Sequence, residues 1–242
     1  MIKNLINKIK DEIERRVYLN ELYEDVRNID EVLLQKRLEI FEEILNPKFC
    51  DIGLKKWNGK YLWFNEFNNE GIKNVIGYNV LKGFGGGFTF GNCFYDVPTL
   101  SGKKLINHRT EKSTIITYYK RSYEWQKSLD NKSYLNSDRI NTFNEKKFRK
   151  SILKFLDKNL SKIELWFNQN NSIDNNINSL QFEIENPPFE IGRRLISYEY
   201  ILAFLYKEIG EIQKSKKYIK EHFQKSNHIE SEKELILKKL NT

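Results

Sequence analysis

An α+β fold is predicted by three features of the amino-acid sequence. Residues 1–46 carry apolar side chains every three or four positions, which is the spacing of one helix face. Residues 50–125 instead carry aromatic and β-branched side chains in short runs that Asn, Gly, Ser and Asp interrupt, as strands joined by turns do. Helical spacing returns within residues 142–242. We therefore expect an N-terminal helix pair, an antiparallel sheet and a helical C-terminal half, integrated in a single domain over residues 1–242.

Residues 1–46 are predicted to form two antiparallel helices. A break at Asn28-Ile29-Asp30 separates them, and Asp30 can cap the second helix. Asn46 is expected to end that helix, because the residue before proline disfavours helical backbone. The apolar stripe of the first helix consists of Ile2, Leu5, Ile6, Ile9, Ile13 and Val17.

Residues 50–125 are predicted to form an antiparallel meander of about five strands. Asn58-Gly59 is a turn signal between two strand-like runs, and residues 68–71 (Asn-Asn-Glu-Gly) supply the next turn. The remaining strands are expected at residues 72–81, 88–97 and 114–119. Sequential strands joined by short turns pair as neighbours.

The segment 78–98 concentrates glycine and aromatic residues, and it has two interpretations. Glycines 85–87 could let backbone amides approach an anion beside Lys82. However, no GxxxxGK[ST] pattern is present and no helical pattern follows, so a central strand of a curved sheet is favoured. The pleat then puts Phe88, Phe90 and Phe94 on one face and Thr89, Cys93 and Tyr95 on the other.

The C-terminal half is predicted to begin with a helix at residue 142. Thr142 and Glu145 have the spacing of a capping box, with the threonine hydroxyl at the N-cap. The polar residues 168–179 are expected to form a solvated loop. The apolar stripe of the helix consists of Phe148, Ile152, Phe155 and Leu156.

Residues 201–219 resemble one tetratricopeptide helical hairpin. The match consists of a large residue, a small residue, an aromatic, the turn glycine and a small packing residue, at Leu202, Ala203, Tyr206, Gly210 and Ser215. A lone repeat cannot bury its own apolar face. The resemblance therefore implies a hairpin that packs onto the rest of the domain.

The order of the predicted elements, together with the strand over residues 87–92 (Gly-Phe-Thr-Phe-Gly-Asn), resembles small uncharacterised α+β families of bacterial genomes. Some of these families serve as immunity proteins or as accessory factors in defence loci. The resemblance implies a bacterial protein that works through a protein partner, and it assigns no functional residue.

The cysteines and the N-terminal residues indicate in which cellular compartment the protein is expected. Cys50 and Cys93 form no CxxC or Cys/His cluster, so neither a zinc site nor a disulfide scaffold is expected. No cofactor is expected either. The first sixteen residues alternate charged and apolar side chains, unlike a signal peptide, and no window holds eighteen consecutive apolar residues. We expect a soluble protein of the cytoplasm that does not enter membranes.

The best polar cluster is His108-Arg109-Thr110-Glu111, on a connection between strands. His108 could act as a general base, Arg109 could bind a carboxylate and Glu111 could act as an acid. The competing interpretation is a solvated loop. His222 and His228 are expected to have surface or packing roles.

A formal net charge of +8, from 41 Lys and Arg against 33 Asp and Glu, permits attraction to nucleic acid, anionic lipid or an acidic protein. Trp57, Trp63 or Tyr119 would stack on bases if exposed. The competing interpretation of the basic residues is the solvated face of an amphipathic helix. The basic stripe consists of Lys147, Lys150, Lys154 and Lys158.

The leading hypothesis is a non-catalytic cytoplasmic protein that binds another protein, because a catalytic constellation is missing and the C-terminal hairpin is repeat-like. One alternative is a nucleic-acid-binding protein that uses the lysine stripe. The other is an enzyme with a site around His108 and Arg109.

Overall fold

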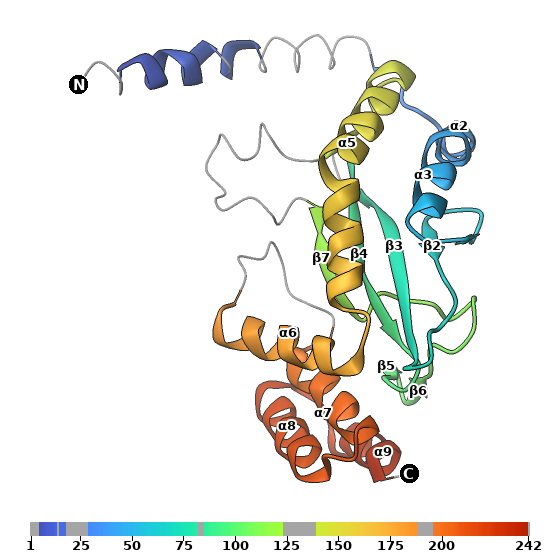
Figure 1. Ribbon diagram of the computed structural model, residues 1–242, viewed down its shortest axis with the longest axis vertical. Coiled ribbons are helices and arrows are strands. Elements are labelled where there is room, and N and C mark those ends of the chain that lie inside the picture. Colours follow the sequence, from blue (N-terminus) through green and yellow to red (C-terminus); the bar gives the residue numbers. More distant parts are fainter. Residues whose placement is uncertain are drawn as a thin grey trace.

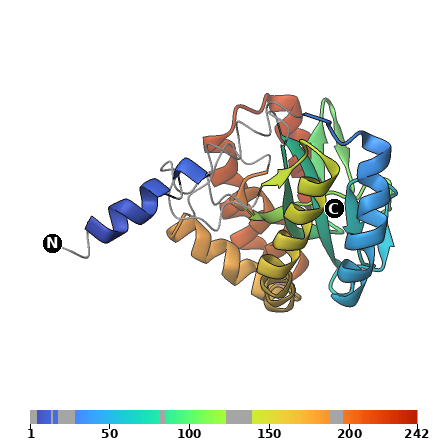
Figure 2. The same cartoon turned by 90° about the horizontal axis from the view of Figure 1, so that it is seen from above.

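The computed structural model describes residues 5–13, 15–17, 29–81, 85–122, 139–187 and 196–241. An antiparallel sheet lies at its centre, and helices cover one face and one end of it (Figures 1 and 2). The α+β architecture and the helical C-terminal half are as predicted. The strands pair in the order β1 (Lys56–Trp57), β2 (Leu62–Phe64), β3 (Ile72–Leu81), β4 (Gly85–Phe94) and β7 (Tyr118–Arg121), and β8 (Ile140–Asn141) pairs with the start of β4.

The long strands β3 and β4 form the centre of the sheet, with a register that runs from Ile72 opposite Phe94 to Leu81 opposite Gly85. The bounds predicted for β3 are confirmed, whereas β4 begins and ends three residues earlier than predicted. Phe88, Phe90 and Phe94 pack into the helix-covered core, while Cys93 lies in a separate cluster on the other face. The prediction that the three phenylalanines lie on one face of the sheet and Cys93 on the other is therefore confirmed.

Two glycines of β4, Gly86 and Gly91, are sites of close approach. Residues 85–87 are buried. A Cβ atom at Gly86 would overlap the ring of Tyr78, and one at Gly91 would overlap the carbonyl oxygen of Tyr118. Residues 85–87 belong to β4 and pair with β3, and residues 85 and 86 also pair with β8, so the central-strand interpretation is confirmed for them. Lys82 lies outside the described residues.

The turns between the strands follow the local signals. The Oδ1 atom of Asn58 accepts hydrogen bonds from the N–H groups of residues 60–62, and Gly59 has a φ of +74°. The hairpin loop spans residues 58–61, so it is longer than the two-residue turn that Asn-Gly favours. Residues 99–106 form a second hairpin that the sequence did not predict, with strands β5 (Thr99–Ser101) and β6 (Lys104–Ile106).

One helix runs through α2 (Leu34–Ile40), the π-helical segment η1 (Phe41–Leu45) and α3 (Asn46–Asp51). The prediction that it ends at Asn46 is wrong. The π-helical segment ends two residues before Pro47, and its wider turn accommodates a residue that cannot donate a backbone hydrogen bond. The helix buries Phe41 and Phe49 against Trp63 of the sheet.

The predicted helix pair does not form a packed pair. Residues 5–13 and 15–17 are helical, but this N-terminal helix projects away from the body of the protein (Figures 1 and 2). The residues just before α2 instead contact the segment that follows β8. The backbone N–H groups of Asp30 and Val32 donate hydrogen bonds to the carbonyl oxygens of Phe143 and Thr142. The first helix is therefore left without a partner surface among the described residues.

Helix α5 (Glu145–Gln169) lies across the sheet, and its predicted apolar stripe is buried. Its N-cap is Asn144 and not the predicted Thr142. The Asn144 Oδ1 atom accepts a hydrogen bond of 3.0 Å from the N–H of Lys147, whereas Thr142 is buried before the helix begins. The capping-box prediction is wrong because asparagine, two residues later, caps as well as threonine does.

Substituting Asn144 with alanine is expected to lower the free energy of unfolding by about 1 kcal/mol, because the N-cap hydrogen bond is lost. Chemical denaturation measures the change. Asn144→Ser, which keeps a capping oxygen, should stay within about 0.5 kcal/mol of the wild type. An equal loss for both variants would contradict the assignment of the cap.

The predicted loop 168–179 is also wrong, because α6 (Ile173–Glu185) occupies most of it. Ser172 caps this helix through a 3.2 Å hydrogen bond from the N–H of Asn175. The buried side chain of Asn176 donates to the carbonyl oxygen of Asn170 and accepts from Asn92 of β4. Polar residues that resemble a solvated loop in sequence therefore join α6 to the sheet.

The C-terminal helices are α7 (Tyr198–Glu208), α8 (Ile212–Lys225) and α9 (Glu230–Asn241). Gly210, with a φ of +79°, makes the turn of the predicted α7–α8 hairpin, and Ser215 is buried. Buried side chains of α7 pack with Phe94 and Tyr118 of the sheet, so the hairpin buries its apolar face on the rest of the chain. No described helix is long and apolar enough to cross a bilayer.

Candidate functional site

His108 points into the protein. Its Nε2 atom lies 2.7 Å from the hydroxyl of Thr99, and its Nδ1 atom hydrogen-bonds to the carbonyl oxygen of Ser113. Burial lowers the pKa of His108, because the charged imidazole would lose its hydration there. The imidazole joins the loop to the β5–β6 hairpin.

Arg109 and Glu111 point elsewhere. The Arg109 guanidinium pairs with Asp96 at 2.5 Å and lies 4.2 Å from the centre of the Tyr95 ring. Glu111 pairs with Lys56, whose ammonium group lowers the pKa of that exposed carboxylate. The three residues of the predicted polar cluster thus have separate partners, and the structure does not bring them together around one substrate position.

The lysine stripe of α5 is only partly an exposed surface. Lys150, Lys154 and Lys158 are exposed and Lys147 is half-buried. Of the aromatic residues proposed to stack on bases, Trp63 and Tyr119 are buried, whereas Trp57 is half-buried and stacks on Trp63 with the ring centres 6.0 Å apart. Binding of nucleic acid by the lysine stripe stays a prediction.

A cavity of about 910 Å³ lies on the sheet face that α5 does not cover. Gly77, Thr89 and Tyr119 contribute its sheet wall, and they alternate along their strands with residues that face the helix-covered core. The β5–β6 hairpin, residues 114–117 and the C-terminal helices complete the wall. All three histidines of the chain line this cavity: His108, His222 and His228.

A chain of hydrogen bonds joins four side chains at the helical wall of the cavity. Ser197 Oγ lies 2.9 Å from Nδ1 of His222, and His222 Nε2 lies 3.2 Å from Nε2 of His228. His228 Nδ1 lies 2.9 Å from a carboxylate oxygen of Glu232. Burial, together with His228, lowers the pKa of His222 to about 4. His222 is therefore neutral at pH 7.

Sequence reasoning missed this chain of side chains. His228 and Glu232 are four residues apart and contact each other at the start of α9, so this pair is local in the sequence. The contact of Ser197 with His222 spans the α7–α8 hairpin and depends on how the two helices pack.

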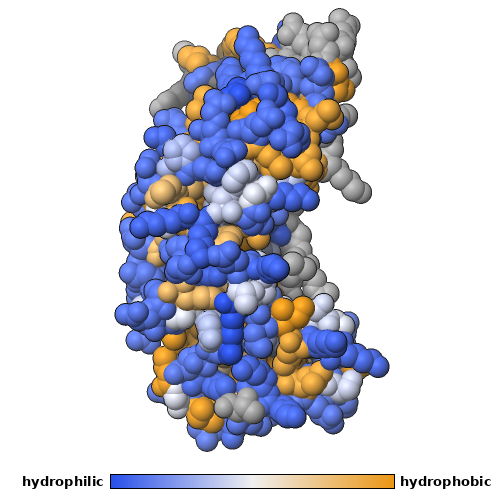
Figure 3. All heavy atoms as spheres, turned by 90° about the vertical axis from the view of Figure 1, so that its right-hand side faces the viewer, coloured by the Kyte–Doolittle hydropathy of each residue, from blue (hydrophilic) through white to orange (hydrophobic). Residues whose placement is uncertain are grey.

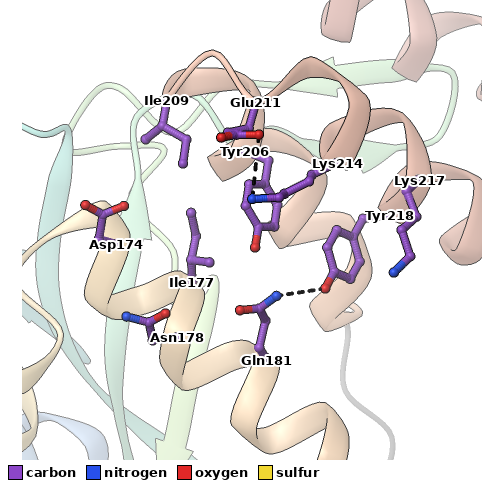
Figure 4. A pocket seen from close by; sticks show the side chains of 10 residues that line it. All are labelled: Asp174, Ile177, Asn178, Gln181, Tyr206, Ile209, Glu211, Lys214, Lys217 and Tyr218. Carbon is purple, nitrogen blue, oxygen red and sulfur yellow. Dashed lines mark hydrogen bonds and ion pairs between the residues drawn. The ribbon is translucent and has the colours of Figure 1, made fainter.

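A smaller cavity of about 490 Å³ lies between α6 and the α7–α8 hairpin (Figure 4). Tyr206 and Tyr218 stack in its wall with their ring planes 6° apart, and Gln181 of α6 donates a 3.1 Å hydrogen bond to the Tyr218 hydroxyl. Lys214 lies 5.3 Å from the Tyr206 ring and 3.6 Å from Glu211. These contacts join α6 to the repeat-like hairpin.

The N-terminal helix has an exposed apolar stripe. The side of the protein that carries α2 and α3 is mostly hydrophilic, with small separate apolar patches (Figure 3). The N-terminal helix instead aligns large apolar side chains with exposed fractions between 54% and 60%: Leu5, Ile6, Ile9, Ile13 and Val17.

Among the described residues, no group of three or more His, Cys, Asp and Glu side chains could hold a metal ion. Comparison with protein-family models, with curated proteins and with solved structures gave no match to this chain.

Proposed function

We propose that the protein acts by binding another protein, and that the N-terminal helix is the element that the partner recognises. The observation that carries the proposal is the exposed apolar stripe of this helix. Burying one side chain such as Ile9 or Ile13 in a partner would contribute about 1.5 to 3 kcal/mol. Contiguous exposed apolar surface of this kind marks interaction sites.

The spacing of the stripe fits a helix that lies in a groove of its partner. Leu5, Ile9, Ile13 and Val17 are four residues apart, which is the spacing of anchors in helix-in-groove recognition. The partner that we propose has an apolar groove with an acidic rim, because this chain carries a net charge of +8. The same charge makes a second copy of the chain a poor occupant of the stripe. A bacterial immunity protein or defence-accessory protein would act in this way, and that role is part of the proposal.

A double substitution of the stripe tests the proposal. Ile9→Asn with Ile13→Asn is expected to weaken binding to the purified partner at least about a hundredfold, since each lost anchor contributes at least about 1.4 kcal/mol. The matched control is Asp11→Asn with Arg15→Asn, which places the same residue type on the polar side without changing the net charge. Isothermal titration calorimetry at about 150 mM salt gives the dissociation constants, once the partner captured from the native host has been purified.

Three outcomes would count against this function. Equal affinity of the two double variants would remove the stripe from the interface. If light scattering shows a dimer, and only the double variant Ile9→Asn with Ile13→Asn is a monomer, the stripe binds a second copy of the chain. Flotation of the wild type with phosphatidylserine vesicles, lost in the same variant, would assign the stripe to a lipid surface.

A further inference from the structure

We infer that the cavity on the open face of the sheet is an esterase site, in which Ser197 is the nucleophile and His222 the general base. His228 and Glu232 act through His222 as positioning residues. The substrate class is a carboxylic ester with an apolar acyl group. This inference is independent of the N-terminal helix and its partner.

The positions of the protons in this chain of hydrogen bonds can be assigned by starting from the carboxylate of Glu232. The Glu232 carboxylate only accepts, so Nδ1 of His228 carries hydrogen. Nε2 of His228 then accepts from the Nε2–H of His222. His222 is left with a free lone pair on Nδ1, which accepts from the hydroxyl of Ser197. This tautomer is the one that a general base requires.

Ser197 is placed at a position that favours negative charge. It is the N-cap of α7, and its Oγ accepts a 3.2 Å hydrogen bond from the N–H of Tyr200. The positive end of the helix dipole stabilises an alkoxide or an oxyanion that develops there. Glu199 also interacts with Ser197, but its carboxylate is already paired with Lys225 at 2.5 Å. The Ser197 hydroxyl thus has two acceptors, Glu199 and Nδ1 of His222, and the proton transfer that we infer uses the 2.9 Å hydrogen bond to His222.

The reaction has two balanced steps. The Ser197 oxygen forms a bond to the ester carbonyl carbon while its proton passes to Nδ1 of His222, whose Nε2–H is held by His228, and Glu232 orients His228. The bond to the alcohol oxygen then breaks, and His222 returns the proton to that oxygen. A water molecule attacks the acyl-serine in the same way, which releases the carboxylic acid and restores Ser197.

The lining of the cavity indicates an apolar acyl group. A volume of about 910 Å³ is in the range that holds small-molecule ligands. The apolar part of the lining includes Leu81, Leu100, Ile106, Ile115, Ile116 and Ile236.

The test uses the full chain with p-nitrophenyl acetate, butyrate and octanoate. We expect release of p-nitrophenolate, with a kcat/KM that rises with acyl length, and a single adduct on Ser197 when an alkyl fluorophosphonate is used as the probe. Ser197→Asn keeps an N-cap side chain but removes the nucleophile, and it should lower kcat/KM at least about a hundredfold. Ser172→Ala, which removes the corresponding cap of α6, is the matched control for a loss of helix capping and should retain activity.

Glu232→Gln tests the positioning role. Its amide N–H can donate to Nδ1 of His228, which reverses the chain and puts hydrogen on Nδ1 of His222, so kcat should fall at least about tenfold with KM unchanged. Ile9→Asn with Ile13→Asn should keep full esterase activity. Absence of ester turnover and of an adduct on Ser197, wild-type turnover by Ser197→Asn, or an unchanged kcat in Glu232→Gln would each overturn the inference.

Discussion

Substitution of Gly91 with alanine is expected to lower the free energy of unfolding by about 3 kcal/mol or more. A Cβ atom at this position would overlap the carbonyl oxygen of Tyr118 and lie 2.7 Å from the Cα atom of Tyr119. Both are backbone atoms of β7, which pairs with β4 through Gly91 itself. The overlap can therefore be relieved only by moving β7 and breaking its hydrogen bonds to the central strand.

Denaturant unfolding of Gly91→Ala, followed by circular dichroism, measures this loss. Gly85→Ala is the matched control on the same strand, because the nearest atom to its Cβ would be the carbonyl oxygen of Ile140 at 3.7 Å. That control should stay within about 1 kcal/mol of the wild type. A Gly91→Ala variant as stable as Gly85→Ala would show that β4 and β7 do not pair in this register.

Acidification from pH 7 to pH 5 is expected to cost about 2 kcal/mol of stability through His222 alone. Its folded pKa of about 4 lies below the ordinary value of 6.5, so the unfolded chain binds the proton more tightly. This contribution is fully present above pH 6.5 and is lost as the pH falls towards 4. The groups that face His222 are His228, Glu199 and the Ser197 hydroxyl, and His108 contributes in the same direction.

Unfolding of the wild type and of His222→Gln at pH 7, 6 and 5 measures the effect. The variant should lose about 2 kcal/mol less than the wild type across this interval. Glu199 has a lowered pKa, so its contribution is lost only below about pH 4.5, outside the interval. Parallel curves for the two proteins would mean that His222 is not buried as a neutral imidazole.

Local signals predicted the turns and the central strands, whereas the strand expected at residues 114–119 is instead β7 at Tyr118–Arg121. The turns at Asn58-Gly59 and Asn68–Gly71 lie where the sequence places them, and the bounds of β3 are as predicted. The alternation of Phe88, Phe90 and Phe94 also held, because a period of two follows from the pleat of a single strand. Such features depend on residues that are neighbours in the chain.

The errors fall where distant residues decide the structure. The polar residues 168–179 read as a loop, yet Asn176 is buried because Asn92 of β4 supplies its partner. Pro47 read as a helix end, yet the π-helical segment before it allows the helix to continue. The stripe of the N-terminal helix was predicted to pack against the next helix, yet the residues that lead into α2 form backbone hydrogen bonds with residues 142–143.

In the candidate sites too, contacts between sequence neighbours can be predicted, whereas contacts between distant residues cannot. His228 and Glu232 are close in sequence, since His228 lies two residues before α9 and Glu232 lies in the first turn of that helix. Ser197 and His222 meet only after α7 and α8 pack, and His108 joins the same cavity from the opposite wall. His108, Arg109 and Glu111, although consecutive in a polar loop, are separated by partners that no local pattern reveals.

The sequence by itself determined the α+β class, the central strands with their facing side chains, and the apolar stripe of the first helix. Periodicity and turn chemistry carry this information, because they act over a few residues. Only the tertiary structure decided that this stripe stays exposed and that Ser197, His222 and His228 line one cavity. These outcomes depend on side-chain contacts between elements far apart in the chain, which are established only when the sheet and the C-terminal helices pack together.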